Sequence, residues 1–217
     1  MRSRLGIAGG DYVDGLGVGD AVLIPRHGDP YTQPHRIDHA ANMQTLVDAG
    51  CDRVLALSSV GGLRRELGVG TFLCPDDFIA LHVGKSAFAD RSSHRVAGFD
   101  SGWRARLVAA WGRNAGTELL DGGVYWESIG PRFETPAEIR MIAQHADVIG
   151  MTIASECVIA GELGLRYSAV CIVDNLANGV GESELTVDEF QAGRAQNRER
   201  LGAEIAAIVP ELSEDSP

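Results

Sequence analysis

Short apolar runs recur along the chain, and most of them end in glycines or in polar residues. Runs of this length, rich in valine, leucine and isoleucine, are typical of buried β-strands. The predicted strands, each with the turn that follows it, are residues 5–11, 20–28, 53–62, 72–82, 122–129, 147–149 and 167–175.

Between these strands the apolar positions change to helical spacing, which predicts an alternating α/β chain. Thr135, Pro136 and Glu138 mark one helix start, because they match an N-cap, a first helical proline and the glutamate of a capping box. Thr186 and Glu189 have the same spacing. The other predicted helices are residues 42–47, 103–111, 155–165 and 190–209. We expect a single domain over residues 1–212 and a frayed tail over residues 213–217.

The composition is that of a folded protein without membrane segments. Apolar residues make up 45% of the 217 positions and charged residues 23%, which excludes disorder, and no apolar run approaches the roughly 20 residues of a membrane helix. The first residues lack the apolar region of a signal peptide, so we expect a cytoplasmic protein. The four cysteines are widely spaced, which favours buried thiols over disulfides or a metal site.

The net charge of −11 opposes nucleic acids and acidic membranes as partners, since both need a basic surface. A small anion remains possible, because a few arginines and backbone N–H groups can form a local positive site.

Polar residues follow several predicted strands, at the edge where open α/β sheets bind ligands. Arg26 and His27 end one strand, and Ser58 and Ser59 lie near the end of another. An arginine fork suits phosphate oxygens, although a terminal Arg-His pair can also be a surface pair and a small-residue turn can be only a turn.

Two further segments favour a ligand with a planar ring. Phe133 and Glu134 precede the capped helix, so their side chains are free of its hydrogen bonds. Asn175 ends the last predicted strand, and its carboxamide can both donate and accept hydrogen bonds. Asp174 is the alternative if the register differs by one residue, and either can be a plain turn residue.

The segment Gly130-Pro-Arg-Phe-Glu-Thr-x-Ala-Glu, followed by Gly150-Met-Thr, resembles the trimeric purine nucleoside phosphorylases and the methylthioadenosine or methylthioinosine phosphorylases. Further matching pieces extend from Leu5 to Val209. The resemblance implies a three-layer α/β/α fold with a central mixed, partly barrel-like sheet. It also implies a homotrimer, or a hexamer built as a dimer of trimers, with inorganic phosphate as co-substrate and no metal or organic cofactor.

The resemblance also assigns roles to individual positions. Phosphate would be bound by Arg26, His27, Ser58, Ser59 and Thr152, and Asn175 or Asp174 would stabilise N7 of the departing base. Phe133 would stack on the base, Glu134 would accept from N1–H, the Met151 backbone would contact the ribose, and Val187 would cover the 5′ end. Tyr31 would lie on the sugar side, and Phe99 would reach a neighbouring subunit's site.

Several residues depart from the family's pattern. Asp11 occupies a phosphate-loop position where the family has a hydroxyl, and a carboxylate there would repel phosphate unless it points away or is protonated. The alternative is that Asp11 caps a turn and the loop is shifted along the sequence. Asp38 and His39 stand where the family usually has asparagine and tyrosine, and Tyr31 where it often has histidine. These differences predict an altered sugar side of the site.

The sequence therefore predicts phosphorolysis of a 6-oxopurine nucleoside. Glu134 and Asn175 favour hypoxanthine or guanine, and Val187 favours an apolar 5′-substituent such as a thioether, as in methylthioinosine. Two alternatives remain open at this point: a hydrolytic purine nucleosidase in which Asp11 activates water, and a non-catalytic nucleoside-binding or storage protein of the same fold.

Overall fold

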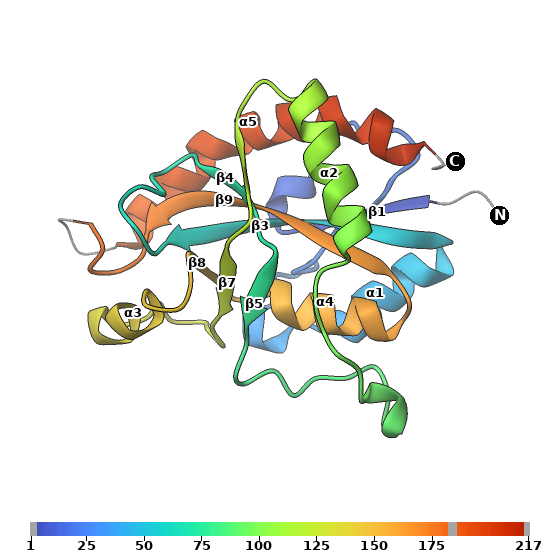
Figure 1. The fold of residues 1–217 in the computed structure, drawn as a ribbon, viewed down its shortest axis with the longest axis horizontal. Helices are drawn as coiled ribbons and strands as arrows, with labels where there is room; N and C mark the ends of the chain where they lie inside the picture. Colours follow the sequence, from blue (N-terminus) through green and yellow to red (C-terminus); the bar gives the residue numbers. More distant parts are fainter. Residues whose placement is uncertain (1–3, 182–185, 215–217) are drawn as a thin grey trace.

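The computed structural model describes residues 4–181 and 186–214, without the side chain of Glu189 (Figure 1). The strands are β1 Arg4–Gly9, β2 Val22–Pro25, β3 Cys51–Gly62, β4 Phe72–Cys74, β5 Asp77–Ile79, β6 Leu119–Asp121, β7 Val124–Glu127, β8 Val148–Gly150 and β9 Arg166–Leu176. The helices are α1 His39–Asp48, α2 Ser101–Asn114, α3 Pro136–Ile142, α4 Ile153–Glu162 and α5 Val187–Ser213. Three short 3-10 turns cover Asp11–Val13, Pro34–Arg36 and Arg91–Ser93.

The long strand β3 organises the sheet. One of its edges pairs in parallel with β9 over most of its length, while β1 pairs in parallel with its first half and β8 pairs antiparallel with its last two residues. The strands follow the order β5-β7-β8-β3-β9-β4-β6, and β2 joins through β1. Parallel and antiparallel pairs therefore share one sheet, as the resemblance predicts.

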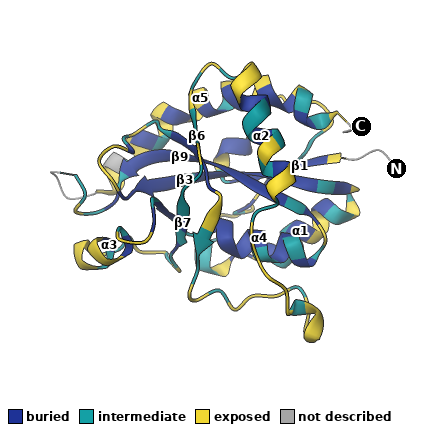
Figure 2. Ribbon diagram, in the orientation of Figure 1, coloured by how far each residue is buried: buried dark blue, intermediate teal, exposed yellow. Residues whose placement is uncertain are grey.

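Helices cover both faces of this sheet (Figure 1). Helices α2 and α5 contact each other and β9 on one face, and α1 and α4 contact each other on the opposite face. Side chains alternate along the central strand, since Leu55 and Leu57 pack in the cluster that includes α2 and α5 residues, whereas Val54 and Ala56 pack in the cluster with α1 and α4. Figure 2 shows the buried central strands between helices with exposed outer faces.

Local signals explain where several helices begin. Thr135 and Glu138 form the predicted capping box of α3, with the Thr135 hydroxyl accepting from Glu138 N and the Glu138 carboxylate accepting from Thr135 N. Asp38, at a family asparagine position, is the N-cap of α1 and accepts from Ala41 N at 3.0 Å. Asp38 therefore has a structural reason to be present. The predicted capping box at Thr186 falls partly on the Glu189 side chain, which lies outside the described residues.

One predicted strand is divided in the structure. Residues 72–82, predicted as one strand, form two short strands, β4 and β5, which pair with different partners. Pro75 stands between them and has no backbone N–H to continue a ladder. None of the described helices is long and apolar enough to cross a membrane.

Candidate active site

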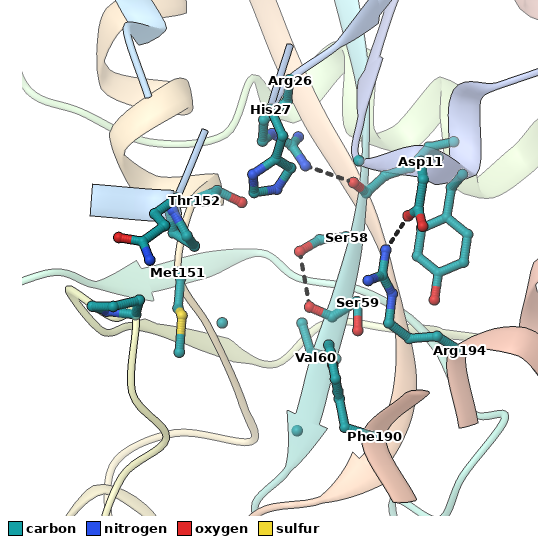
Figure 3. A pocket seen from close by; sticks show the side chains of 18 of the residues that line it. Asp11, Arg26, His27, Ser58, Ser59, Val60, Met151, Thr152, Phe190 and Arg194 are labelled. Carbon is teal, nitrogen blue, oxygen red and sulfur yellow. Dashed lines mark hydrogen bonds and ion pairs between the residues drawn. The ribbon is translucent and has the colours of Figure 1, made fainter. Parts of the chain in front are cut away.

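A cavity of about 820 Å³ opens where several strands end (Figure 3). Its walls come from the ends of β1, β2, β3, β8 and β9, from the loop before α3 and from α5. Ten predicted site residues line it: Arg26, His27, Tyr31, Ser58, Ser59, Phe133, Glu134, Met151, Thr152 and Asn175. Strand ends distant in the sequence thus form one site.

Arg26 reaches this cavity from the end of β2, but its guanidinium is largely committed to the protein. Nε and Nη2 donate to the two carboxylate oxygens of Glu156, both at 2.8 Å. Nη1 donates to the Leu57 carbonyl and Nη2 also donates to the Ala8 carbonyl. An arginine has five N–H donors, so one Nη1–H of Arg26 remains for a ligand.

Glu156, on α4, is the counter-ion that the predicted site lacked. Its side chain is fully buried, and it also accepts from the Tyr167 hydroxyl at 2.8 Å. Burial opposes its ionisation, but the charge of and hydrogen bonds from Arg26 hold the pKa of Glu156 well below its usual range, with His39 acting in the same direction. The same contacts raise the pKa of Arg26 against the effect of burial. The pair therefore stays charged at neutral pH.

His27 is oriented by two contacts. Its Nδ1 donates to the Thr32 carbonyl at 2.8 Å, and Tyr31 stacks on its ring with centroids 4.7 Å apart. Burial is the main cause that lowers the pKa of His27. A neutral His27 with its proton on Nδ1 presents Nε2 as an acceptor, so it suits a protonated phosphate oxygen or a sugar hydroxyl.

Three residues with hydroxyl groups line the cavity. Ser59 Oγ is buried and, within the described residues, has no hydrogen-bond partner. Ser58 Oγ donates to the Ser59 carbonyl at 3.2 Å, and Thr152 begins α4 without a side-chain capping bond. A buried hydroxyl without a partner costs free energy, so Ser59 is best explained as a group that a polar ligand satisfies.

The structure separates the two candidates at the end of β9. Val60 pairs with Val173 and Gly61 with Asn175, so Asp174 is an extra residue in the strand. Asp174 points away from the cavity and accepts from the Tyr12 hydroxyl and from Asn197 Nδ2. Asn175 lines the cavity instead.

Asn175 keeps ligand-binding capacity in this position. Its Nδ2 donates one hydrogen bond, to the Leu176 carbonyl at 2.9 Å. The carboxamide oxygen and the second N–H remain to accept from and donate to a ligand.

An aromatic pair also lines the cavity. Phe133 packs edge-on against Phe190 of α5, with ring centroids 5.4 Å apart, and both rings line the cavity. Glu134 lies beside Phe133, and its backbone carbonyl accepts from Asn178 Nδ2 at 3.1 Å. Val187, predicted at this end, is 58% exposed and is not part of the cavity wall, whereas Phe190 one turn later is.

Phe99 lies outside the cavity wall of its own chain, whereas Asp11 and Arg194 are part of it. Phe99 packs against Phe78 and Tyr167 and does not line the cavity of its own chain. Asp11 lines the cavity and forms an ion pair with Arg194 of α5, a residue predicted only as part of a helix. Among the described residues, no group of three or more histidine, cysteine or acidic side chains could hold a metal ion.

Solved structures share this fold. A methylthioadenosine phosphorylase from Schistosoma mansoni in complex with adenine superposes with a TM-score of 0.83 over 98% of this chain and 93% of that one, at 22% identity. Identity at this level supports the fold alone, and the predicted mixed α/β/α arrangement is confirmed.

Sequence relatives cover most of the chain. A probable 6-oxopurine nucleoside phosphorylase from Archaeoglobus fulgidus is 39% identical over 186 residues, which cover 85% of this chain and 75% of the relative. A probable S-methyl-5′-thioinosine phosphorylase from Pseudomonas syringae pv. tomato is 32% identical over 220 residues, covering 96% of this chain and 89% of the relative. Residues 3–210 match the Phosphorylase superfamily. The predicted resemblance is confirmed, and the chain belongs to the phosphorylase superfamily.

Proposed function

We propose that this chain catalyses the phosphorolysis of a 6-oxopurine nucleoside with an apolar 5′-substituent, such as methylthioinosine. The observation that carries the proposal is the shared cavity. It combines a carboxylate and a carboxamide suited to an oxopurine with hydroxyl and cationic groups suited to phosphate. One relative, 39% identical, is named a probable 6-oxopurine nucleoside phosphorylase, and another, 32% identical, is named a probable S-methyl-5′-thioinosine phosphorylase. The two names support the oxopurine base and the thioether at the 5′ end, respectively.

In the proposed reaction, the bond from ribose C1′ to the purine N9 breaks while a phosphate oxygen bonds to C1′. Positive charge develops on the sugar and negative charge on the base, so the enzyme must stabilise both. Phosphate held by His27, Ser59 and Thr152 offsets the sugar's charge and attacks C1′. N7 of the departing base takes up the proton that phosphate loses on forming the ester, Asn175 accepts a hydrogen bond from the resulting N7–H, and free purine leaves.

The base specificity follows from two side chains. Glu134 accepts from N1–H, which hypoxanthine and guanine carry and adenine lacks. Asn175 donates to O6 through its second N–H and accepts from N7–H, a combination that a carboxylate cannot provide. Phe133 provides the aromatic surface for the base.

The 5′ end of the nucleoside is proposed to lie against Phe190. Its ring lines the cavity beside Phe133, and His27 is the one histidine among the described residues of the wall. An aromatic wall leaves a 5′-hydroxyl without a partner and accommodates a thioether.

We propose that the functional assembly is the family's trimer. Residues 86–100, which include Phe99, contain a short 3-10 turn and no other helix or strand. The proposal is supported by the resemblance, which implies that a matching region reaches a neighbouring subunit's site. Light scattering on the purified chain tests the trimer, and a monomer that turns over nucleoside at full rate contradicts it.

The activity is tested by incubating the protein with methylthioinosine, inosine, guanosine or methylthioadenosine, with and without phosphate. We expect purine release that requires phosphate and is fastest with methylthioinosine. Equal release in phosphate-free buffer would identify a nucleosidase, and binding without release would identify a non-catalytic protein. The pairing of Asp11 with Arg194 disfavours the nucleosidase, because it engages the carboxylate that would activate water.

A further inference from the structure

An ion pair between Asp11 and Arg194 lies in the cavity wall (Figure 3). Asp11 follows β1, at the position where the family resemblance predicts a phosphate-binding hydroxyl. Arg194 comes from α5, at the other end of the chain. A lone carboxylate at this position would repel phosphate, whereas a carboxylate paired with a guanidinium carries no net charge.

Arg194 and His27 approach the same point of the cavity. A side-chain carbon built on Gly10 would lie 3.8 Å from Nη2 of Arg194 and 3.9 Å from Nε2 of His27. Gly10 has no such carbon, so the space between the two nitrogen atoms stays open. An anion beside His27 would therefore also lie close to the guanidinium.

Two aromatic rings hold this guanidinium in place. Its central carbon lies 5.5 Å from the ring centroid of Tyr12 and 5.4 Å from that of Phe190. These contacts favour the charged group and restrict its motion. One Nη2–H donates to Asp11, while Nε is buried and has no partner within the described residues. Arg194 therefore retains donor capacity beyond its pair with Asp11.

The charges around the anion site explain why a second arginine is needed. Glu156 neutralises the charge of Arg26, and the protein contacts of Arg26 leave one of its N–H groups for phosphate. A neutral His27 adds no charge. With Asp11 present and Arg194 absent, the remaining groups would carry a net negative charge and oppose phosphate. Arg194 restores neutrality and adds donors in a fork that fits phosphate oxygens.

We propose that Arg194 is a phosphate-binding residue of this enzyme and that Asp11 positions its guanidinium at the anion site. The guanidinium contacts Asp11 through Nη2 and phosphate through its other N–H groups. This inference rests on the proposed phosphorolysis. It also accounts for Asp11, because the carboxylate orients an arginine in place of a hydroxyl that would bind phosphate directly.

The competing explanation is that the ion pair only ties α5 to the loop after β1. Arg198, one turn later on α5, provides a matched control, since it donates to the Asp14 carbonyl of the same loop at 3.4 Å but does not line the cavity. Arg198→Gln removes the same charge and a similar tie without touching the anion site.

The test measures phosphate binding to the protein alone by calorimetry, and the KM values for phosphate and methylthioinosine separately. We expect Arg194→Gln to raise the phosphate Kd and KM by about 10- to 100-fold, the range for a lost hydrogen bond to a charged group, with little change in the nucleoside KM. Asp11→Asn removes the negative charge but keeps an oxygen that can orient Arg194, so it should lower the phosphate Kd. Asp11→Leu keeps neither and should bind phosphate more weakly than Asp11→Asn. Arg198→Gln should leave the phosphate Kd unchanged. The double variant Asp11→Asn/Arg194→Gln should bind phosphate better than Arg194→Gln alone.

Unchanged phosphate binding in Arg194→Gln, or a rise in the nucleoside KM alone, would overturn the proposal. If Arg194→Gln does not fold, the two Asp11 variants decide, because equal phosphate Kd values for Asp11→Asn and Asp11→Leu would contradict the positioning role of Asp11 and overturn the proposal. Calorimetry needs no turnover, so a protein that binds phosphate through Arg194 but releases no purine would refute the proposed function and not this inference.

Discussion

Glu156 should contribute strongly to the stability of the protein through its buried pair with Arg26. Replacing Glu156 with glutamine leaves Arg26 charged and buried without its counter-ion. Removing one partner of a buried ion pair costs about 3–5 kcal/mol, so we expect Glu156→Gln to lower the free energy of unfolding by that amount. Urea denaturation measures the loss, and Glu211→Gln, which breaks the more exposed pair with Arg113, should cost less than about 1 kcal/mol.

The stability that the Glu156 carboxylate contributes through its pair with Arg26 depends on pH. Because Arg26 holds the pKa of Glu156 below its ordinary value of 4.5, the carboxylate's contribution is fully present above pH 4.5. It is lost as the pH falls toward the lowered pKa. Equal stabilities of the wild-type protein and Glu156→Gln at pH 7 would contradict the importance of the pair.

Asn175 should determine the choice of base. In Asn175→Asp, an ionised carboxylate can no longer donate to O6 of a 6-oxopurine but can accept from the 6-amino group of adenine. We expect kcat/KM for methylthioinosine to fall by about 100-fold, the effect of losing a hydrogen bond in a desolvated site, while the value for methylthioadenosine rises relative to it. The ratio of kcat/KM for the two substrates is measured in one protein sample, so differences in the amount of active enzyme cancel and no separate control is needed. A ratio equal to that of the wild type would place base recognition elsewhere.

At the residue scale, the sequence predicted His27, Ser59 and Asn175 at or near strand ends. All three line the cavity because the ends of β2, β3 and β9 meet there. Val187 and Phe190 differ by one helical turn, and sequence spacing cannot tell which of them faces the cavity. Arg194 was predicted only as part of a helix, since its partner Asp11 is distant in the sequence.

At the level of elements, the packing of α5 on β9 depends on one glycine. A side-chain carbon on Gly193 would lie 1.8 Å from the Asp174 carbonyl oxygen, a contact that only backbone movement can relieve. We expect Gly193→Ala to destabilise the protein by about 1–3 kcal/mol, the usual cost of overpacking. It should also weaken phosphate binding, because α5 carries Arg194.

Gly202 on the same helix is the matched control. A carbon added there would lie 3.5 Å from Leu16, an ordinary contact, so Gly202→Ala should be neutral or stabilising by up to about 1 kcal/mol through helix propensity. Thermal unfolding of both variants gives the comparison. A Gly193→Ala protein as stable as Gly202→Ala would show that α5 can move away from β9 at no cost.

Elements were predictable where local chemistry marks them. The capping box at Thr135 and the long apolar runs of β3 and β9 gave the correct element types. The three-residue strand β6 was not predicted, because three residues carry too little pattern and its pairing with β4 comes from the tertiary fold. Pro75 was the local signal that would have divided residues 72–82.

The whole molecule is required to form the site, since the cavity joins β1 near the start of the chain to α5 near its end. The family resemblance predicted the mixed sheet, which apolar patterning alone could not, because strand order depends on long-range pairing. The same long-range assembly determines how ligands should affect stability. A ligand that contacts all of these segments binds only when they are folded together.

We therefore expect phosphate to stabilise the entire fold in one cooperative step. At 100 times its Kd, a ligand specific for the native state adds about 2.7 kcal/mol to the free energy of unfolding. For a domain of this size that corresponds to a rise in Tm of roughly 5–10 °C. In urea the midpoint should increase while the slope stays constant, because the surface exposed on unfolding is unchanged. Sodium chloride at matched ionic strength is the control, and an equal rise with chloride, or a transition that splits in two, would mean that phosphate does not bind a site built from the whole chain.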